Sequence, residues 1–148
     1  GDMSADFSRY ANLGDIKLKE FAACTAYKFY ESAMVIENPN KYDDWIPRDT
    51  TYNDGGFISE PVGRYVRNPW DLFDMHGNVW EWTLSSYQPY PYNEKDGRNE
   101  TVSENGKRVV RGGSWYDRPY RSTSSFRLPY REYQKVYNVG FRVVMTEE

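Results

Sequence analysis

Two acidic residues and a glycine turn form the clearest candidate for chemistry in this sequence. The pattern is Asp74-x-x-Gly77-x-Val79-x-Glu81. Hard cations such as calcium take about six to eight oxygen ligands. A tight turn at Gly77 can direct backbone carbonyls inward, while the two carboxylates supply negative charge. The pattern is compatible with a calcium site, but the spacing alone favours the alternative, in which Asp74 and Glu81 pair with nearby arginines.

The basic residues gather in one part of the chain. Residues 105–142 hold nine Lys and Arg against two acids, so this segment carries +7 and the remainder carries −10. The nine are Lys107, Arg108, Arg111, Arg118, Arg121, Arg127, Arg131, Lys135 and Arg142. Such asymmetry indicates either internal ion pairs or a surface that faces an anion.

Aromatic residues lie between these cations, and the combination suits an anionic ligand. Arginine can fork onto sulfate or carboxylate, while aromatic rings stack on sugar or peptide planes. We therefore take Arg118, Tyr120 and Arg131 as ligand-binding candidates, with an anionic glycan or an acidic peptide as the partner. Basic aromatic patches also bind nucleic acid, but the net charge of −3 argues against that partner. For Arg111, Arg127 and Arg142 we expect a structural role instead, with each guanidinium forked onto a buried carboxylate.

The counts of cysteine and histidine exclude several classes of site. Cys24 is the one cysteine and His76 the one histidine. An intrachain disulfide, a cysteine-based zinc cluster and a multi-histidine metal site are therefore excluded. His76 has no neighbouring nucleophile motif, so we expect it to be a turn residue.

The length and composition predict one folded domain over residues 1–148. The chain has 14 Tyr, 7 Phe and 5 Trp, which a disordered chain would lack. No apolar run approaches the roughly 20 residues of a membrane span, so no transmembrane segment is expected. An extracytoplasmic location, periplasmic or secreted, is favoured.

Short strands among long loops are the predicted elements. We expect strands at 61–65, 79–82, 107–110 and 139–144, partial helix within 16–36, and loops at 37–56 and 88–106. Trp80 and Trp82 alternate with Glu81, so the two rings should share one face of a strand. The pair Gly112-Gly113 predicts a bulge or a close backbone approach. The fold class is α+β with little helix.

Three segments together resemble a known family. They are Asn68 to Trp82 (NPWDLFDMHGNVWEW), Arg108 to Trp115 (RVVRGGSW) and Val139 to Val144 (VGFRVV). In this order they resemble the C-terminal half of the formylglycine-generating enzyme, or sulfatase-modifying factor, family. Ala11 to Asp15, Asp54 to Gly56 and Pro61 to Gly63 are similar to it as well. The resemblance implies a variant of the C-type lectin fold, with twisted antiparallel strands and loops pinned by calcium.

The resemblance implies two sets of calcium ligands. One set is the side chains of Asp74 and Glu81 with the carbonyls of Gly77 and Val79. The other set is Asn12, the Leu13 carbonyl, Asp54 and the Gly56 carbonyl. The alternative for the second set is that its polar side chains stabilise turns.

The sequence departs from the family at the oxidase site. The family's oxidases bind copper through two cysteines that follow the Gly-Gly-Ser segment, and thiolates suit Cu(I). The first of these positions is Asp117 here, and no cysteine follows it. Ser114 and Trp80 match residues that line the family's active site. Copper is therefore not expected, and the catalytic candidates reduce to a pocket around Ser114, Trp80, Asp117 and Arg121.

Two classes of function follow from the resemblance. The preferred one is a calcium-stabilised member that binds a ligand or protein without oxidase chemistry, a pseudoenzyme. The alternative is an active enzyme that forms formylglycine on a sulfatase cysteine through a different catalytic arrangement. The implied partner is a sulfatase-like client peptide or an anionic glycan. Fold membership alone does not decide between them.

Overall fold

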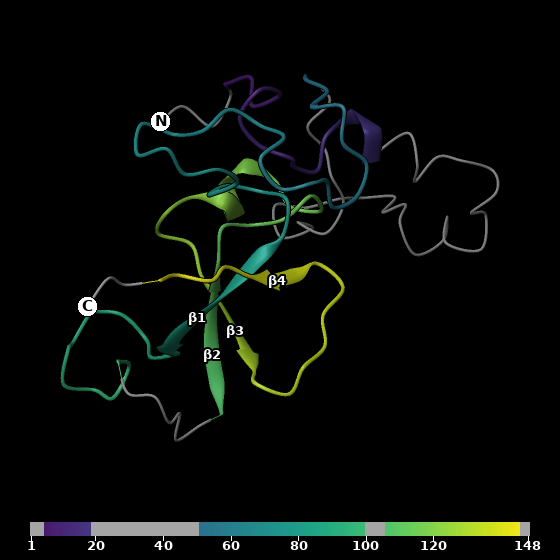
Figure 1. Ribbon diagram of the computed structural model, residues 1–148. Coiled ribbons are helices and arrows are strands. Elements are labelled where there is room, and N and C mark those ends of the chain that lie inside the picture. The colour runs from purple at the N-terminus through teal and green to yellow at the C-terminus, as the bar shows by residue number, and fades with distance from the viewer. Residues whose placement is uncertain (1–4, 19–50, 100–105, 146–148) are drawn as a thin grey trace, which may run out of the picture.

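A mixed four-stranded sheet is the centre of the structure, a computed structural model that describes residues 5–18, 51–99 and 106–145. The strands are β1 (Trp80–Ser86), β2 (Lys107–Arg111), β3 (Leu128–Arg131) and β4 (Val139–Phe141), in the spatial order β3-β2-β1-β4 (Figure 1). A single 3-10 turn, η2 (Pro119–Ser122), lies between β2 and β3 in the chain, and residues 16–18 are helical.

The register of the sheet decides which side chains face the core. β1 pairs antiparallel with β2, β2 antiparallel with β3, and β1 parallel with β4. Trp82 lies opposite Val110 of β2, and Trp80 lies opposite Val139 of β4. Because side chains alternate along a strand, Trp80 and Trp82 share a face and Glu81 takes the other. Trp80 and Val110 are almost completely buried, so this face forms part of the core.

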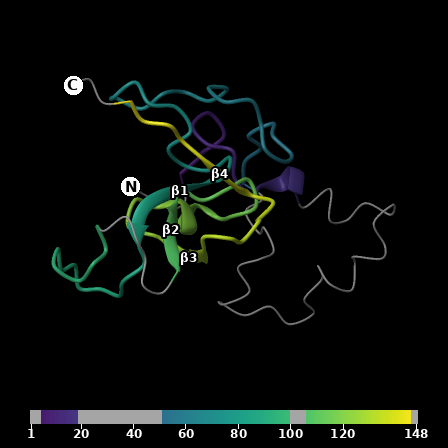
Figure 2. The same cartoon turned by 60° about the horizontal axis from the view of Figure 1, so that its bottom comes forward.

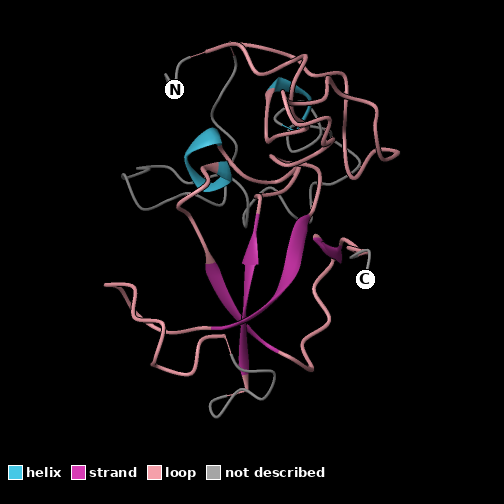
Figure 3. Ribbon diagram, turned by 60° about the vertical axis from the view of Figure 1, so that its left-hand side comes forward, coloured by secondary structure: helices cyan, strands magenta, loops and turns pink. Residues whose placement is uncertain are grey.

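Most of the loops gather beyond one end of the sheet, as Figures 2 and 3 show from two further directions. The N-terminal segment reaches these loops through a bridge between Asn12 and Gly77. The Asn78 amide donates to the Asn12 carbonyl at 2.8 Å, and the Gly77 amide donates to the Gly112 carbonyl at 2.8 Å. Three distant parts of the sequence therefore meet at the turn around Gly77.

The sequence predicted the positions of the two interior strands of the sheet well. The strands predicted at 79–82 and 107–110 are confirmed as β1 and β2. The final strand is shorter than predicted and ends at Phe141. The strand predicted at 61–65 is wrong, because Gly63 takes a φ of +78° and turns the chain. The helix predicted within 16–36 lies mostly outside the described residues.

No helix in the described ranges is both long and apolar enough to cross a membrane.

Candidate functional site

Two consecutive glycines turn the chain directly after β2. Gly112 and Gly113 have φ values of +95° and +76°, which non-glycine residues rarely adopt. A Cβ atom on Gly113 would overlap the side chain of Ser122, whereas one on Gly112 would make ordinary contacts with the Met75 carbonyl at 3.5 Å and the Val79 carbonyl at 4.0 Å. The close backbone approach predicted for this pair is thus seen at Gly113.

The turn places Ser114 and Asp117 in one hydrogen-bonded cluster. One carboxylate oxygen of Asp117, Oδ2, accepts from Trp80 Nε1 at 2.7 Å, from the Ser114 amide at 3.0 Å and from Ser114 Oγ at 2.5 Å. Asn138 Nδ2 donates to Ser114 Oγ at 2.9 Å. The other oxygen, Oδ1, lies 3.5 Å from Arg121 Nη1. The four predicted pocket residues are therefore brought together, with Asn138 as a fifth member.

Three of these four side chains are enclosed by the protein. Ser114, Trp80 and Asp117 are 0%, 1% and 3% exposed, while the side chain of Arg121 is 30% exposed. They form a closed polar cluster with Arg121 at its edge, and a ligand can reach only the edge. Burial raises the pKa of Asp117, and its hydrogen bonds with Ser114, the charge of Arg121 and the Trp80 contact oppose that rise.

Aromatic side chains surround the Asp117 cluster. Trp115, Tyr116 and Tyr137 contact one another, with ring centroids 5.5 to 6.2 Å apart. Burial raises the pKa of Tyr116, Tyr130 and Tyr137, and the Asp117 charge adds to the rise at each. Tyr137 is 73% exposed, so this ring also faces solvent. We call Trp115, Tyr116, Tyr130 and Tyr137 the aromatic rim.

Arginines of the basic segment form ion pairs both within the segment and with the rest of the chain. Among the described residues these pairs include Arg108–Glu132, Arg121–Asp117 and Arg142–Glu81. The first two use the acids of the segment, and the third reaches the acidic remainder. Arg127 lies instead over the rings of Tyr87 and Tyr90, at 4.9 and 3.9 Å.

The predicted ligand-binding residues do not all lie together. Arg118 is the residue before η2, and Tyr120, within it, is 60% exposed and contacts Phe126. Arg131 lies at the far end of β3, opposite Lys107 of β2. At about 3.3 Å per residue, β3 carries Arg131 well away from η2. Arg118 and Tyr120 thus neighbour the Asp117 cluster, and Arg131 does not.

The first predicted cation site lies in a loop with unusual backbone geometry. Asp74 and Asn78 have φ values of +53° and +64°, and Gly77 has +74°. Asp74 Oδ2 accepts from the Gly63 amide at 2.7 Å, while its Oδ1 is buried with no hydrogen-bond partner among the described residues. A buried carboxylate oxygen without a partner is costly, and a cation would satisfy it. Asp74 therefore fits the predicted role.

Glu81 already has a positively charged partner. Arg142 donates to both of its carboxylate oxygens, at 2.6 and 2.8 Å, and also to the carbonyls of Phe73 and Asp74. The alternative raised by the sequence, that these acids pair with arginines, is thus seen at Glu81 and not at Asp74. Glu81, Gly77, Val79 and Asp74 line one pocket together with Arg142, so the predicted ligand set is assembled around that arginine.

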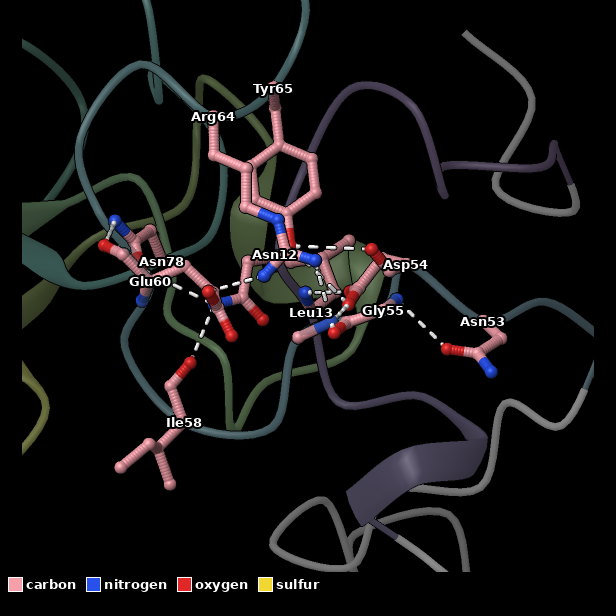
Figure 4. A network of polar contacts seen from close by, with 11 residues as sticks. Asn12, Leu13, Asn53, Asp54, Gly55, Ile58, Glu60, Arg64, Tyr65 and Asn78 are labelled. Atoms are coloured by element: carbon pink, nitrogen blue, oxygen red, sulfur yellow. Dashed lines mark hydrogen bonds and ion pairs between the residues drawn. The ribbon is translucent and has the colours of Figure 1, made fainter.

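The second predicted cation site is a network of hydrogen bonds that joins distant parts of the chain (Figure 4). The two oxygens of Asp54 accept from the Leu13 amide at 2.8 Å and from the Gly56 amide at 2.7 Å. Asn12 Nδ2 donates to the Ile58 carbonyl at 2.7 Å. Burial raises the pKa of Asp54 to about 6, against the two backbone hydrogen bonds. Asn12, Leu13, Asp54 and Gly56 are therefore brought together. The turn-stabilising alternative is seen at Asp54, which accepts from the Gly56 amide, and not at Asn12, whose contacts are with distant residues.

Carboxylates alone could not hold a metal ion at either place. Among the described residues, no three His, Cys, Asp or Glu side chains converge. A cation at Asp74 or Asp54 would therefore depend on backbone carbonyls, as the predicted ligand sets do.

Residues 18–147 match the family described as the sulfatase-modifying factor enzyme 1-like domain. The chain belongs to this family. "Inactive C-alpha-formylglycine-generating enzyme 2" of Mus musculus is 31% identical over 113 residues, which cover 70% of this chain and 32% of that protein. "Formylglycine-generating enzyme" of Mycobacterium tuberculosis is 30% identical over 118 residues, covering 68% and 38%. This member of the family thus spans about a third of the length of these relatives.

Two solved structures share its fold. PvdO from Pseudomonas aeruginosa matches with a TM-score of 0.53 and 25% identity, over 70% of this chain and 42% of that one. Treponema denticola variable protein 1 matches with a TM-score of 0.51 and 21% identity, over 68% and 40%. The predicted fold is confirmed: this domain has the sulfatase-modifying-factor-type variant of the C-type lectin fold.

Sequence reasoning missed two features of the site. Asn138, which holds Ser114 Oγ, lies 24 residues from it and carried no local signal. Tyr137 was not singled out either, although its position beside Asn138 and the final strand, within an aromatic-rich segment, could have indicated it.

Proposed function

We propose that this family member is a binding domain without oxidase chemistry, and that its ligand is anionic. The observation that carries the proposal is the burial and hydrogen bonding of the Asp117 carboxylate. This residue stands where the family's resemblance places the first copper cysteine, and its carboxylate is closed off by Trp80 and Ser114. A thiolate pair would favour Cu(I), whereas a buried carboxylate that already accepts three hydrogen bonds offers neither soft ligands nor an open position.

The ligand face is Arg121 together with the aromatic rim. Arg121 is the cationic and partly exposed edge of the cluster, and Tyr137, which contacts Trp115 and Tyr116, exposes most of its ring. Tyrosine rings give contact area at low entropic cost, and a guanidinium recognises sulfate and carboxylate through paired hydrogen bonds. A sulfated glycan or an acidic peptide, such as one from a sulfatase-like client, fits this chemistry.

Calcium supports the loops in this proposal. Asp74 and Glu81 with the carbonyls of Gly77 and Val79 would hold one ion, whose charge would satisfy the buried Oδ1 atom of Asp74. Asn12 and Asp54 with the carbonyls of Leu13 and Gly56 would hold another. The expected role is to fix the loops that position β1 and the N-terminal segment, not to take part in chemistry.

Retention on a heparin column tests the anionic ligand. We expect the protein to bind at low salt and to elute as salt rises, since the Debye length falls from about 10 Å at 0.1 M to about 3 Å at 1 M. Arg121→Ala and Tyr137→Ala should each elute at lower salt. Arg67→Ala is the matched control, because Arg67 pairs with Asp71 in an exposed loop that contributes nothing to the aromatic rim.

Three results would count against this proposal. The wild-type protein could flow through at low salt, both rim variants could elute with the wild type, or Arg67→Ala could reduce retention as much as Arg121→Ala. Tyr137→Ala removes a mostly exposed ring, so its result does not depend on the ion pair between Arg121 and Asp117.

A further inference from the structure

A pocket lies where the N-terminal segment passes η2, apart from the aromatic rim. The residues that line it include Phe7, Tyr10 and Leu13 of the N-terminal segment, Pro119 and Ser122 of η2, and His76. These residues come from three distant parts of the chain. None of them belongs to the Asp117 cluster. Leu13 is the one that also belongs to a predicted calcium ligand set, where its carbonyl is the ligand.

The single turn of η2 separates this pocket from the ligand face. In a 3-10 helix, residues i and i+3 lie on the same side. Pro119 and Ser122 are both buried and both line the pocket. Tyr120 is exposed and Arg121 reaches Asp117, so the other two residues of the turn serve the opposite side. The same four residues therefore border two different sites.

The imidazole of His76 is held in one orientation. Its Nδ1 lies 2.6 Å from the Ser122 carbonyl oxygen. A carbonyl oxygen only accepts hydrogen bonds, so Nδ1 must carry the hydrogen in this contact. In the neutral ring Nε2 is then the acceptor. His76 thus gives a fixed hydrogen-bond acceptor to a pocket whose other walls are largely apolar.

The walls and the charge of the pocket define the class of ligand. Phe7 and Tyr10 supply aromatic surface, and Leu13 and Pro119 supply aliphatic surface. A flat ring gains most from such walls, with rings preferring offset or edge contacts. Among the described residues of the wall, Asp6 carries the only formal charge. This charge favours a cationic ligand over an anionic one, in contrast to the face around Arg121.

We infer that this pocket binds a small aromatic molecule with an O–H or N–H donor, which hydrogen-bonds to Nε2 of His76 while its ring packs between Phe7, Tyr10 and Pro119. The inference is independent of the proposed function, because it uses the other side of η2 and a ligand of opposite charge. Pockets with apolar walls and a few convergent polar groups are the usual form of small-molecule sites.

Three matched probes test the inference on the full chain. Tyramine has the ring, the hydroxyl donor and a positive charge; phenethylamine lacks the hydroxyl; 4-hydroxyphenylacetate reverses the charge. Because His76 is the one histidine, its imidazole signals in an NMR spectrum need no assignment by mutation. We expect tyramine to shift these signals saturably in the millimolar range. Phenethylamine should bind about three- to tenfold more weakly, as for the loss of one hydrogen bond, and 4-hydroxyphenylacetate more weakly than tyramine.

Two variants localise the binding. Ser124→Trp places a large ring at an exposed position that lines the pocket, and it should abolish the tyramine shift. Tyr120→Ala alters the other side of η2 and should leave the shift unchanged. The inference is overturned if tyramine gives no saturable shift, if phenethylamine binds as tightly as tyramine, or if Tyr120→Ala loses binding while Ser124→Trp retains it.

Discussion

Replacing Asp117 with alanine should destabilise the domain by about 3–5 kcal/mol. Asp117 Oδ2 is the acceptor for two buried donors that cannot turn elsewhere, the Trp80 indole and the Ser114 amide. A buried donor left without a partner costs about 1–3 kcal/mol, so the two together cost about 2–6 kcal/mol. The Ser114 hydroxyl can rotate, and it still accepts from Asn138. The half-exposed Arg121 loses a long contact, which is worth about 0–1 kcal/mol.

Asp117→Asn is the matched control for this prediction. The amide oxygen can keep all three hydrogen bonds, while its NH2 group faces Arg121 in place of the carboxylate. We expect a cost of roughly 1 kcal/mol, because the hydrogen bonds remain and only the weak ion pair is lost. The comparison separates the lost acceptor from the lost charge.

Urea unfolding measures both variants. With an m-value of about 2 kcal/mol/M, the midpoint of Asp117→Ala should fall by roughly 2 M, and that of Asp117→Asn by less than about 1 M. A double-mutant cycle with Trp80→Phe adds a direct readout of the Trp80–Asp117 contact, with an expected coupling of about 1–3 kcal/mol. A cost below about 1 kcal/mol for Asp117→Ala, or no coupling in the cycle, would refute the reasoning.

Three further predictions follow from the same geometry. Asp74→Asn should lower the melting temperature by about 5 °C in saturating calcium and barely change it in chelator, because the amide keeps the Gly63 contact and only the partnerless oxygen is altered. Gly113→Ala should destabilise by at least about 2 kcal/mol more than Gly112→Ala, since both have positive φ but only Gly113 would meet Ser122. The contribution of Asp117 to stability should fall as pH rises above about 3.8, because burial raises the pKa of Asp117 and its carboxyl in the folded protein keeps a proton that the unfolded chain has lost. Asp117→Asn should remove that part of the pH dependence.

Each of these predictions has a clear contrary result. Equal losses for Asp74→Asn in calcium and in chelator would exclude the ion from that loop. Equal costs for the two glycine variants would mean that backbone strain, not the contact with Ser122, decides the position. A pH profile of Asp117→Asn parallel to that of the wild type would assign the titration to other groups, such as Asp54, whose pKa burial also raises, to about 6.

The sequence predicted the strands of the sheet interior because burial on that face imposes a regular pattern. Trp82 of β1 lies opposite Val110 of β2, and Trp80, on the same face of β1, lies opposite Val139 of β4. β3 was missed because Pro129 argues against a strand, yet β3 is at the edge of the sheet, where a residue without an amide hydrogen is tolerated. The error at Gly63 arose because a positive φ cannot be read from a short apolar run.

The sequence predicted which residues form the candidate site, but it did not predict how deeply they are buried. The resemblance brought Ser114, Trp80, Asp117 and Arg121 together, and the structure does place them within one cluster. Their burial depends on η2 and on Asn138, which no local pattern connects to them. The pairing of Glu81 with Arg142 was open for the same reason, because a contact over 61 residues depends on the tertiary fold.

Formylglycine formation is the most direct test of the claim that this domain binds and does not oxidise. The protein would be incubated with Cu(I), oxygen and a peptide that carries a sulfatase-type cysteine motif, and the peptide mass followed over time. Because Asp117 is buried and hydrogen-bonded at the position where the resemblance places a copper cysteine, we predict no aldehyde product above a copper-only blank. Turnover above that blank would contradict the account.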